Sequence, residues 1–541
     1  MKDNVFGIDL GTSNSALAYL DALGTPKIKE NGDGDMTTPS VVWFESASNT
    51  VVGKLAREEK LFSPTKVIDL VKRDMGREKD WEFHGRQYTP ESISALILRS
   101  LVSLVEDGPG KTPVVITVPA YFGAKEREAT RNAGEIANLD VLNLVAEPVA
   151  AALFYDSQTP LKGKNLLVYD LGGGTFDVTA VRGEGDSFTI VATDGDARLG
   201  GADWDRALSE HLLDKYVDAT GDEAAEEDDT FRLKLRDQAV ACKEALSKSE
   251  SYTVRLSSDT GGRAKITVTR DEFNQLTAPL LQRTEVCFDR LLTAVEEKDP
   301  GFEFDEVILV GGSSRMTAVS ELVQRRTGLE PQIFEPDLAI AKGAALSATI
   351  SQLENMAGAG ADDAERERAV REFAAKSGID AGQLEALSTK KVLNVLPKAI
   401  GLSVLDEEDR PFIDHLVTQN ATIPLAEPVS RTYLTRFDGQ TTVDLTLFQQ
   451  ASDVASTDVA LNEVITGAET KLSGIPPMAA GQEIRVDLSV AGDGLISVQG
   501  THVASGQSVA ADVRIGVMSE EQIAAARASL RGMKVSQDED A

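Results

Sequence analysis

Two segments far apart in the chain share one arrangement of residues. Residues 5–18 read VFGIDLGTSNSALA, and residues 168–181 read VYDLGGGTFDVTAV. In each segment an apolar run ends in Asp-Leu. Glycine and small hydroxyl residues follow, and then a second apolar run begins. The pattern predicts two β-hairpins whose turns use glycine because glycine accepts a positive φ and lets the backbone approach closely.

Glycine-rich turns expose backbone N–H groups that bind an anion with no Cβ in the way. Two such hairpins facing each other would hold a phosphate chain from both sides, and the internal repeat argues against two unrelated tight strand connections. Asp9 and Asp170 end the first strands, and Asp177 lies on a return strand. Carboxylates repel phosphates unless a cation lies between them, so we expect Mg²⁺ held largely through water. The same aspartates could equally orient a water for attack on a γ-phosphate.

A third segment, residues 307–326, runs from an apolar strand through Gly-Gly into a helix. This layout brings a nucleotide against a helix N-terminus. Residues 146–153 and 336–348 form two helices of small residues, which could approach closely and slide as a hinge. Simple close packing explains either helix alone equally well.

The alternation of segments predicts an α/β fold followed by an all-β domain. We expect strands at 5–10, 15–20, 113–118, 165–170, 176–182 and 306–310, and helices at about 90–106, 123–137, 203–217, 231–248, 271–297 and 315–327. After a charged, alanine-rich stretch, period-two alternation indicates a sandwich. The predicted divisions are 1–350 (α/β), 351–391 (charged helical insert), 392–397 (linker), 398–516 (β-sandwich) and 517–541 (short helix and acidic tail).

The composition limits the partners that we expect. A formal net charge of −32 argues against nucleic acid and against an anionic membrane surface. Cys242 and Cys287 lack the spacing of a metal site. The strand pattern begins by Val5, which leaves no room for a signal peptide, and no apolar run approaches the length of a membrane span. We therefore expect a cytoplasmic protein.

On its motifs, the chain resembles the DnaK-type, 70-kilodalton heat-shock chaperone family over nearly its whole length. Residues 72–101 are most similar to the short HscC-type branch. The resemblance implies an actin-like, two-lobed ATPase domain followed by a β-sandwich that binds extended apolar peptide. The motifs that carry it are GIDLGTSNS (7–15), VKRDMG (71–76), VVITVPAYF (114–122), AEPVAAAL (146–153), VYDLGGGTFDVT (168–179), RLGGADWD (198–205), ILVGGSSRM (308–316) and NATIP (420–424).

The same resemblance implies roles for individual residues. The ligands would be ATP or ADP, Mg²⁺ and K⁺. The catalytic set would be Lys72 beside the γ-phosphate, with Glu147, Asp170, Asp177, Asp9 and Thr175; of these, Asp9, Asp170 and Asp177 would hold the metal ions. The nucleotide would contact Gly11, Thr12, Ser13, Asn14, Gly172, Gly173, Gly174, Gly200, Gly201, Lys243, Ser247, Gly311, Gly312, Ser313, Arg315 and Asp337. The peptide groove would use Leu402, Leu405, Tyr433, Val443 and Leu445, although plain sandwich core remains an alternative for Leu445.

The chain departs from the family pattern at the C-terminal lid, at the interdomain linker and at the loop that precedes Glu147. The chain ends about one helix after the sandwich, so the resemblance implies a nearly absent lid and fast exchange of peptide. Asn394 stands where the family linker carries an aspartate. Asn143 and Ala146 replace an asparagine and arginine pair, which implies altered contacts with a J-domain co-chaperone.

Two further departures concern nucleotide exchange and the insert. Val240 stands where a glutamate is usual beside the nucleoside, and the hairpin at 255–268 is short. We therefore expect fast nucleotide exchange, with an exchange factor dispensable. The insert at 352–390 has no counterpart in the family pattern, and a spacer is its simplest interpretation.

These observations predict an ATP-dependent chaperone that binds extended apolar segments of unfolded proteins. The main alternative is a nucleotide-binding holdase or exchange factor with weak domain coupling. A small-molecule kinase shares the two-lobed clamp but needs a catalytic-base aspartate in a polar sugar pocket. A filament-forming actin relative, like the kinase, leaves the β-domain without a purpose.

Overall fold

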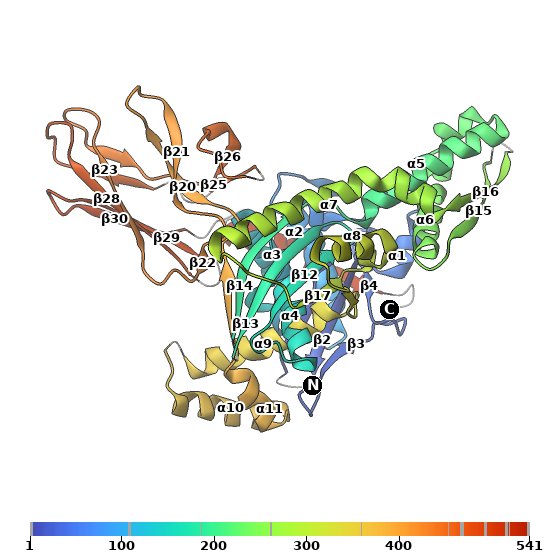
Figure 1. Ribbon diagram of the computed structural model, residues 1–541, viewed down its shortest axis with the longest axis horizontal. Helices are drawn as coiled ribbons and strands as arrows, with labels where there is room; N and C mark the ends of the chain where they lie inside the picture. The colour runs from blue at the N-terminus through green and yellow to red at the C-terminus, as the bar shows by residue number, and fades with distance from the viewer. Residues whose placement is uncertain are drawn as a thin grey trace.

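A computed structural model describes residues 4–537, apart from 106–109, 186, 260–261, 359, 453, 466–469, 492–494, 514–517 and 519. Two α/β lobes lie side by side, and a β-sandwich stands beside them at the upper left of Figure 1. All the strands and helices that the sequence predicts in the first 350 residues are present within a few residues of the expected bounds. None of the described helices is long and apolar enough to cross a membrane.

The two lobes repeat one strand arrangement. In lobe I, β1 (Phe6–Asp9) pairs antiparallel with β2 (Asn14–Leu20) and parallel with β10 (Pro113–Val118). In lobe II, β12 (Asn165–Leu171) pairs antiparallel with β13 (Phe176–Glu184) and parallel with β17 (Glu306–Val310). The two glycine turns therefore occupy equivalent places at the ends of equivalent hairpins, as the sequence repeat indicates.

Helices cover both sheets. In lobe I, α2 (Pro90–Ser103) packs on α3 (Ala124–Ile136), which contacts β10 and β11 (Asp140–Ala146). In lobe II the long α7 (Arg270–Lys298) contacts β13 and β14 (Ser187–Asp196). Farther from the linker, lobe II carries α5 (Gly201–Thr220), α6 (Asp229–Leu246), β15 (Ser251–Ser257), β16 (Arg263–Thr269) and α8 (Thr317–Thr327).

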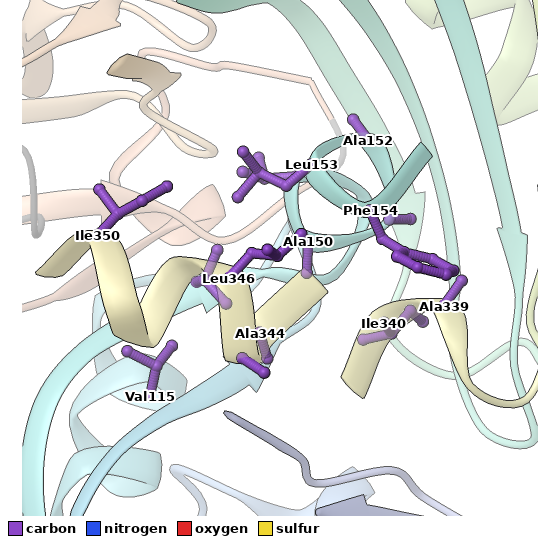
Figure 2. Packing of buried hydrophobic residues seen from close by; sticks show 14 of the residues in the cluster. Val115, Ala150, Ala152, Leu153, Phe154, Ala339, Ile340, Ala344, Leu346 and Ile350 are labelled. Atoms are coloured by element: carbon purple, nitrogen blue, oxygen red, sulfur yellow. The ribbon is translucent and has the colours of Figure 1, made fainter. Parts of the chain in front are cut away.

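The two small-residue helices cross between the lobes. They are α4 (Glu147–Gln158) and α9 (Ala339–Ala357), and Figure 2 shows Ala150 of α4 beside Ala344 and Leu346 of α9. A Cβ on Gly343 would lie 1.7 Å from the carbonyl oxygen of Ala150, so the two backbones are in direct contact. The same buried cluster takes in strand residues from both sheets. The crossing therefore joins the lobes.

The insert is not a spacer. Its helices α10 (Asp363–Ser377) and α11 (Ala381–Ser388) pack on α9, with Phe373 and Leu384 buried in the cluster between the lobes. The backbone N–H of Asp380 donates to the carbonyl of Ala22 in lobe I, at 2.9 Å. At its end, Lys390 pairs with Asp156 of α4 at 2.6 Å. The sequence hid this packing because only three of the α10 side chains are fully buried and the rest are polar or small.

The segment predicted as a linker forms a strand in the sheet of lobe II. Strand β19 (Lys391–Val395) pairs parallel with β14 and antiparallel with β22 (Thr422–Ile423) of the sandwich. The resulting seven-stranded sheet has the order β18-β17-β12-β13-β14-β19-β22, where β18 is Gln332–Ile333. Main-chain hydrogen bonds thus run without a break from the glycine hairpin of lobe II to the sandwich.

Side chains hold the sandwich against both lobes. The amine of Lys298, at the end of α7, donates to the carbonyls of Val191 and Asn420, each at 2.9 Å. On lobe I, the backbone N–H of Ala124 donates to Gln449 at 3.2 Å, and Lys125 pairs with Glu463 at 3.1 Å. The structure therefore shows the docked arrangement of the two parts.

The sandwich has two four-stranded sheets and a short third pair. Strand β28 (Glu483–Val490) alternates as predicted, with Ile484, Val486, Leu488 and Val490 all buried in the core. One sheet has β21 (Pro411–Val417), β20 (Ile400–Leu405), β25 (Leu447–Gln450) and β26 (Asn462–Val464); the other has β23 (Val429–Leu434), β28, β29 (Ile496–His502) and β30 (Ser508–Val513); β24 (Thr442–Asp444) pairs with β27 (Lys471–Ser473).

The C-terminal segment returns to lobe I. Helix α12 (Glu520–Ser529) contacts α3, and β31 (Lys534–Ser536) pairs parallel with β6 (Asn49–Val52). Residues 520–537, interpreted from the sequence as a truncated lid, contact lobe I in the structure. The acidic tail, 538–541, lies outside the described residues.

We predict that Gly343→Ala destabilises the ATPase lobes. The added methyl group collides with the backbone of α4, and overpacking of this kind costs about 1–3 kcal/mol. Chemical denaturation followed by circular dichroism measures the change. Gly382→Ala on the exposed face of α11 is the matched control and should be neutral or stabilising. An unchanged free energy of unfolding for Gly343→Ala would contradict the close contact.

Candidate functional site

The two glycine turns touch across the space between the lobes. A Cβ on Gly173 would lie 2.1 Å from the hydroxyl oxygen of Ser13, and one on Gly174 would lie 2.3 Å from the methyl carbon of Thr12. Only glycine permits this approach. The structure thus brings together the expected phosphate-contacting residues of both hairpins, which are Gly11–Asn14 and Gly172–Thr175.

Three buried carboxylates gather beside these turns. Asp170 and Asp177 are opposite each other in the β12–β13 hairpin, and Glu147 begins α4. One oxygen from each lies within 4.8 Å of the others, and Asp170 Oδ2 and Asp177 Oδ2 have no hydrogen-bond partner within the described part of the chain. Clustered hard oxygen donors with free lone pairs are suited to Mg²⁺. The metal-binding set predicted from the sequence is Asp9, Asp170 and Asp177, whereas the three carboxylates that the structure brings within this distance are Glu147, Asp170 and Asp177.

Asp9 lies next to this group and shares its electrostatics. It accepts a hydrogen bond from Thr117 Oγ1 at 3.1 Å. Burial, with the charge of Glu147 second, raises the pKa of Asp9 to about 7. Burial first and Glu147 second also raise the pKa values of Asp170 and Asp177 well above the ordinary range. Burial and mutual repulsion therefore disfavour the ionised form of these carboxyl groups, and a bound cation would stabilise that form.

Lys72 provides a buried positive charge at the centre of the site. It lies in the 3-10 turn η2 (Val71–Asp74), directly after Leu70 with its φ of 57°. Its amine donates to Glu147 Oε1, and the residue is 4% exposed. An amine buried beside phosphate-binding turns can contact a terminal phosphate once a nucleotide is bound.

The residues expected around the nucleoside form two groups. A Cβ on Gly201 would lie 2.3 Å from Ser313 Oγ and 2.9 Å from Lys243 Nζ. Arg315 and Asp337 form a bidentate pair with bonds of 2.8 and 2.6 Å. The Ser247 hydroxyl instead donates to the carbonyl of Lys243 in its own helix, at 3.1 Å. The remaining glycines pack against site groups: Gly200 against Gly174, Gly311 against Asp170 and Gly312 against Asp337.

The expected peptide-groove residues are divided between core and surface. Leu402 and Leu445 are 3% and 2% exposed and belong to the sandwich core, so the core alternative is the one the structure favours for Leu445. Leu405 is 46% exposed. Tyr433 and Val443 are partly buried, and the Tyr433 hydroxyl donates to Asp414 at 2.8 Å.

Arg73 and Asp203 are site residues that sequence reasoning missed. Arg73 Nε donates to the carbonyl of Gly174 at 2.9 Å, and its guanidinium pairs with Asp203 at 2.6 Å. Asp203 also accepts from the backbone N–H of Gly200 at 3.0 Å. Arg73 thus ties the turn that carries Lys72 to the glycine turn of lobe II. The signal was available, because both residues lie inside quoted motifs, VKRDMG and RLGGADWD.

Facing glycine hairpins, clustered carboxylates and a buried lysine define a phosphate-binding, two-lobed domain joined by a strand to a β-sandwich. The family model described as Hsp70 protein matches residues 5–84, 79–358 and 367–540. The chain belongs to the Hsp70 family. Its members are ATP-dependent chaperones that hydrolyse ATP, bind ATP or ADP with Mg²⁺, and interact with unfolded peptides and J-domain co-chaperones.

We predict that Asp170→Asn raises stability while abolishing activity. Removing one of the crowded charges should raise the melting temperature of the nucleotide-free protein by about 3 °C. The same change removes a carboxylate that the metal and water need, so ATP hydrolysis should fall by about 100-fold or more. Calorimetry and a phosphate-release assay measure the two effects.

The stability gain should depend on pH in a defined direction. A carboxyl whose pKa is raised on folding destabilises the fold above that pKa, and this cost disappears as the pH falls toward the unfolded value. Because burial, with the charge of Glu147 second, raises the pKa of Asp170 well above its ordinary value of 3.8, the melting-temperature difference between variant and wild type should shrink from pH 8 to pH 5. A difference that grows over this range would contradict the assignment.

We predict that Arg73→Gln speeds ADP release and slows hydrolysis. The substitution removes the charge-assisted bonds between the lobes, which are each stronger than neutral ones. We expect ADP to dissociate several-fold faster in stopped flow with a fluorescent nucleotide. Arg77→Gln, an exposed neighbour on the same segment, is the control and should leave the release rate unchanged. Equal ADP release rates for the two variants would mean that the Arg73 bonds between the lobes do not slow nucleotide release.

Proposed function

We propose that this protein binds and releases extended apolar segments of unfolded proteins in a cycle coupled to ATP hydrolysis. The observation that carries the proposal is the seven-stranded sheet, which includes the site strands β12 and β13, the linker strand β19 and the sandwich strand β22. A change at the glycine hairpin can reach the sandwich through this one sheet. Coupling of two sites through a shared two-state element is the physical basis of such a cycle.

The residues of the site suit hydrolysis of a nucleoside triphosphate. Glu147, Asp170 and Asp177, with Asp9 beside them, would hold Mg²⁺, and K⁺ would lie nearby. The metal supplies charge neutralisation for the β- and γ-phosphates. The carboxylates accept hydrogen bonds from the attacking water and orient it, and Lys72 contacts the γ-phosphate.

A short path links the site to the sandwich. Two residues beyond Asp177 in β13, the Thr179 hydroxyl bonds with that of Thr193 in β14, at 2.8 Å. The backbone N–H of Thr193 donates to the side chain of Asn420 at 3.1 Å. Asn420 is the first residue of the NATIP segment (420–424), which contains β22. We infer that hydrolysis loosens this path and releases the linker strand β19 from the sheet, and that the sandwich then closes its groove.

The groove lies at the sandwich edge that carries exposed apolar residues. Leu405 is 46% exposed, and Leu434 and Phe437 are 65% and 63% exposed. Arg436 pairs with Asp409 at 2.6 Å and so joins the loops that follow β23 and β20. An extended peptide would gain main-chain hydrogen bonds and apolar burial here, next to Val443. Helix α12 contacts α3 of lobe I, an arrangement that would leave the groove open to rapid exchange of peptide.

The finer features of the cycle follow from the departures in sequence. We propose a cytoplasmic protein of the short HscC-type branch. Its contacts with a J-domain co-chaperone would be altered at Asn143, Ala146 and Asn394. Val240 is 37% exposed on α6 and offers no polar group to a nucleoside, which supports fast exchange without an exchange factor.

We predict that an extended, leucine-rich peptide accelerates steady-state ATP hydrolysis several-fold in Mg²⁺ and K⁺. Val443→Phe should remove the acceleration by filling the groove, and basal hydrolysis should persist. Val503→Phe is the matched control, because Val503 is an exposed sandwich valine at the end of β29. Hydrolysis that is indifferent to peptide in the wild type would contradict the coupling and favour the holdase alternative.

A further inference from the structure

The C-terminal segment is built into lobe I. We name residues 520–537 the C-terminal clasp. Ile523, Leu530 and Met533 are 8%, 1% and 3% exposed and are part of the same hydrophobic cluster as α2 and α3. Met518, just before the clasp, packs partly buried against this cluster. The segment therefore completes the core of the ATPase lobe and does not rest on its surface.

Polar contacts fix the clasp along its length. The Arg99 guanidinium of α2 donates to the carbonyls of Leu530 and Met533, at 3.0 and 3.2 Å. Arg527 donates to the carbonyl of Glu135 at the end of α3, at 2.9 Å. The two Arg99 bonds go to carbonyls in the turn after α12, and the Arg527 bond goes to a carbonyl in the last turn of α3.

The last strand, β31, and the residue that follows it both bond to lobe I. The backbone N–H of Lys534 donates to the carbonyl of Ser48 at 2.9 Å, where β31 joins β6. The Gln537 side chain accepts from the backbone N–H of Gly32 at 2.8 Å and donates to the Ser100 hydroxyl at 3.0 Å. The clasp thus binds three separate parts of lobe I.

A short chain connection joins the clasp to the sandwich, so the clasp tethers the sandwich to lobe I. The last strand of the sandwich, β30, ends at Val513, and Met518 already contacts lobe I. Five peptide steps span at most about 18 Å when fully extended. The other end of the sandwich enters through β19. The sandwich is therefore attached to the ATPase lobes by both of its chain ends.

The two attachments differ in strength. The linker strand β19 makes short pairings and buries Val395 at 6% exposure while Leu393 is 38% exposed, whereas the clasp buries three large apolar side chains in a core. We propose that the clasp stays bound through the nucleotide cycle and keeps the sandwich close to lobe I after the linker has left its sheet. The linker's release is part of the proposed function, and the proposal rests on it to that extent.

The first test asks whether the clasp stays bound. A protease site is inserted after Gly516, and the purified protein is cleaved and passed over a size-exclusion column with ATP or with ADP. We expect the fragment beginning at Val517 to co-elute with the rest of the chain in both nucleotides. Elution of the fragment on its own in either nucleotide would overturn the proposal.

The second test measures the tether without any insertion. Ala504→Cys in the sandwich and Glu58→Cys on the lobe I helix α1 (Lys54–Glu59), both exposed positions, take a donor and an acceptor dye; Cys242 and Cys287 are buried. In the otherwise intact chain we expect similar energy transfer in ATP and ADP. In Leu530→Asp/Met533→Asp, which breaks the clasp, transfer should fall in ADP. Ala525→Asp/Ala528→Asp adds the same charges at exposed positions of α12 and should behave as the intact chain.

The outcomes separate the tether from the cycle. An intact chain that separates in ADP as far as the broken-clasp variant, or a variant that separates in neither nucleotide, would overturn the tether. A variant that separates equally in ATP and ADP would uphold the tether and count against nucleotide coupling. Circular dichroism and binding of a fluorescent nucleotide show that the broken-clasp variant retains folded lobes.

Discussion

The arrangement of this protein depends on main-chain hydrogen bonding through one sheet. Seven strands run from β18 to β22, and they belong to lobe II, to the linker and to the sandwich. Since sheet bonds are short and directional, a linker strand is either in register or out of the sheet. In the proposed cycle, this sheet would carry a change at the β12–β13 turn to the sandwich.

The carboxyl groups of the site, on β12 and β13 of this sheet and on neighbouring elements, repel one another when no ligand is bound. Four carboxyl groups and one lysine share a buried space, and the pKa values of three of the aspartates rise because of it. The fold tolerates the charges because the α4–α9 crossing and the glycine contacts leave the two lobes little room to spread. Groups held in a costly state of this kind are those that a metal and a polyphosphate can stabilise when they bind.

Local patterns in the sequence predicted most of the fold and about half of the site. The repeated hairpins, the small-residue helices and the alternation of β28 depend on near neighbours in the chain, so each was visible. The packing of Phe373 between the lobes, the role of Arg73 and the pairing of β31 with β6 depend on residues that lie far apart in the chain, by 101 positions for Arg73 and Gly174 and by more for Arg73 and Asp203. Leu402 and Leu445 show the same limit, because an alternating strand does not reveal whether its apolar face meets a groove or a core.

The pairing of β31 with β6 also bears on how the chain folds during synthesis. Residues 49–51 must wait for residues 534–536 before their sheet is complete, although the rest of lobe I is made early. A ribosome therefore finishes the sandwich before the ATPase domain has its last strand. Contacts of such high sequence separation form late. Until residues 520–537 have been made, the nascent lobe I therefore lacks the strand partner of β6 and the apolar side chains that pack against α2 and α3.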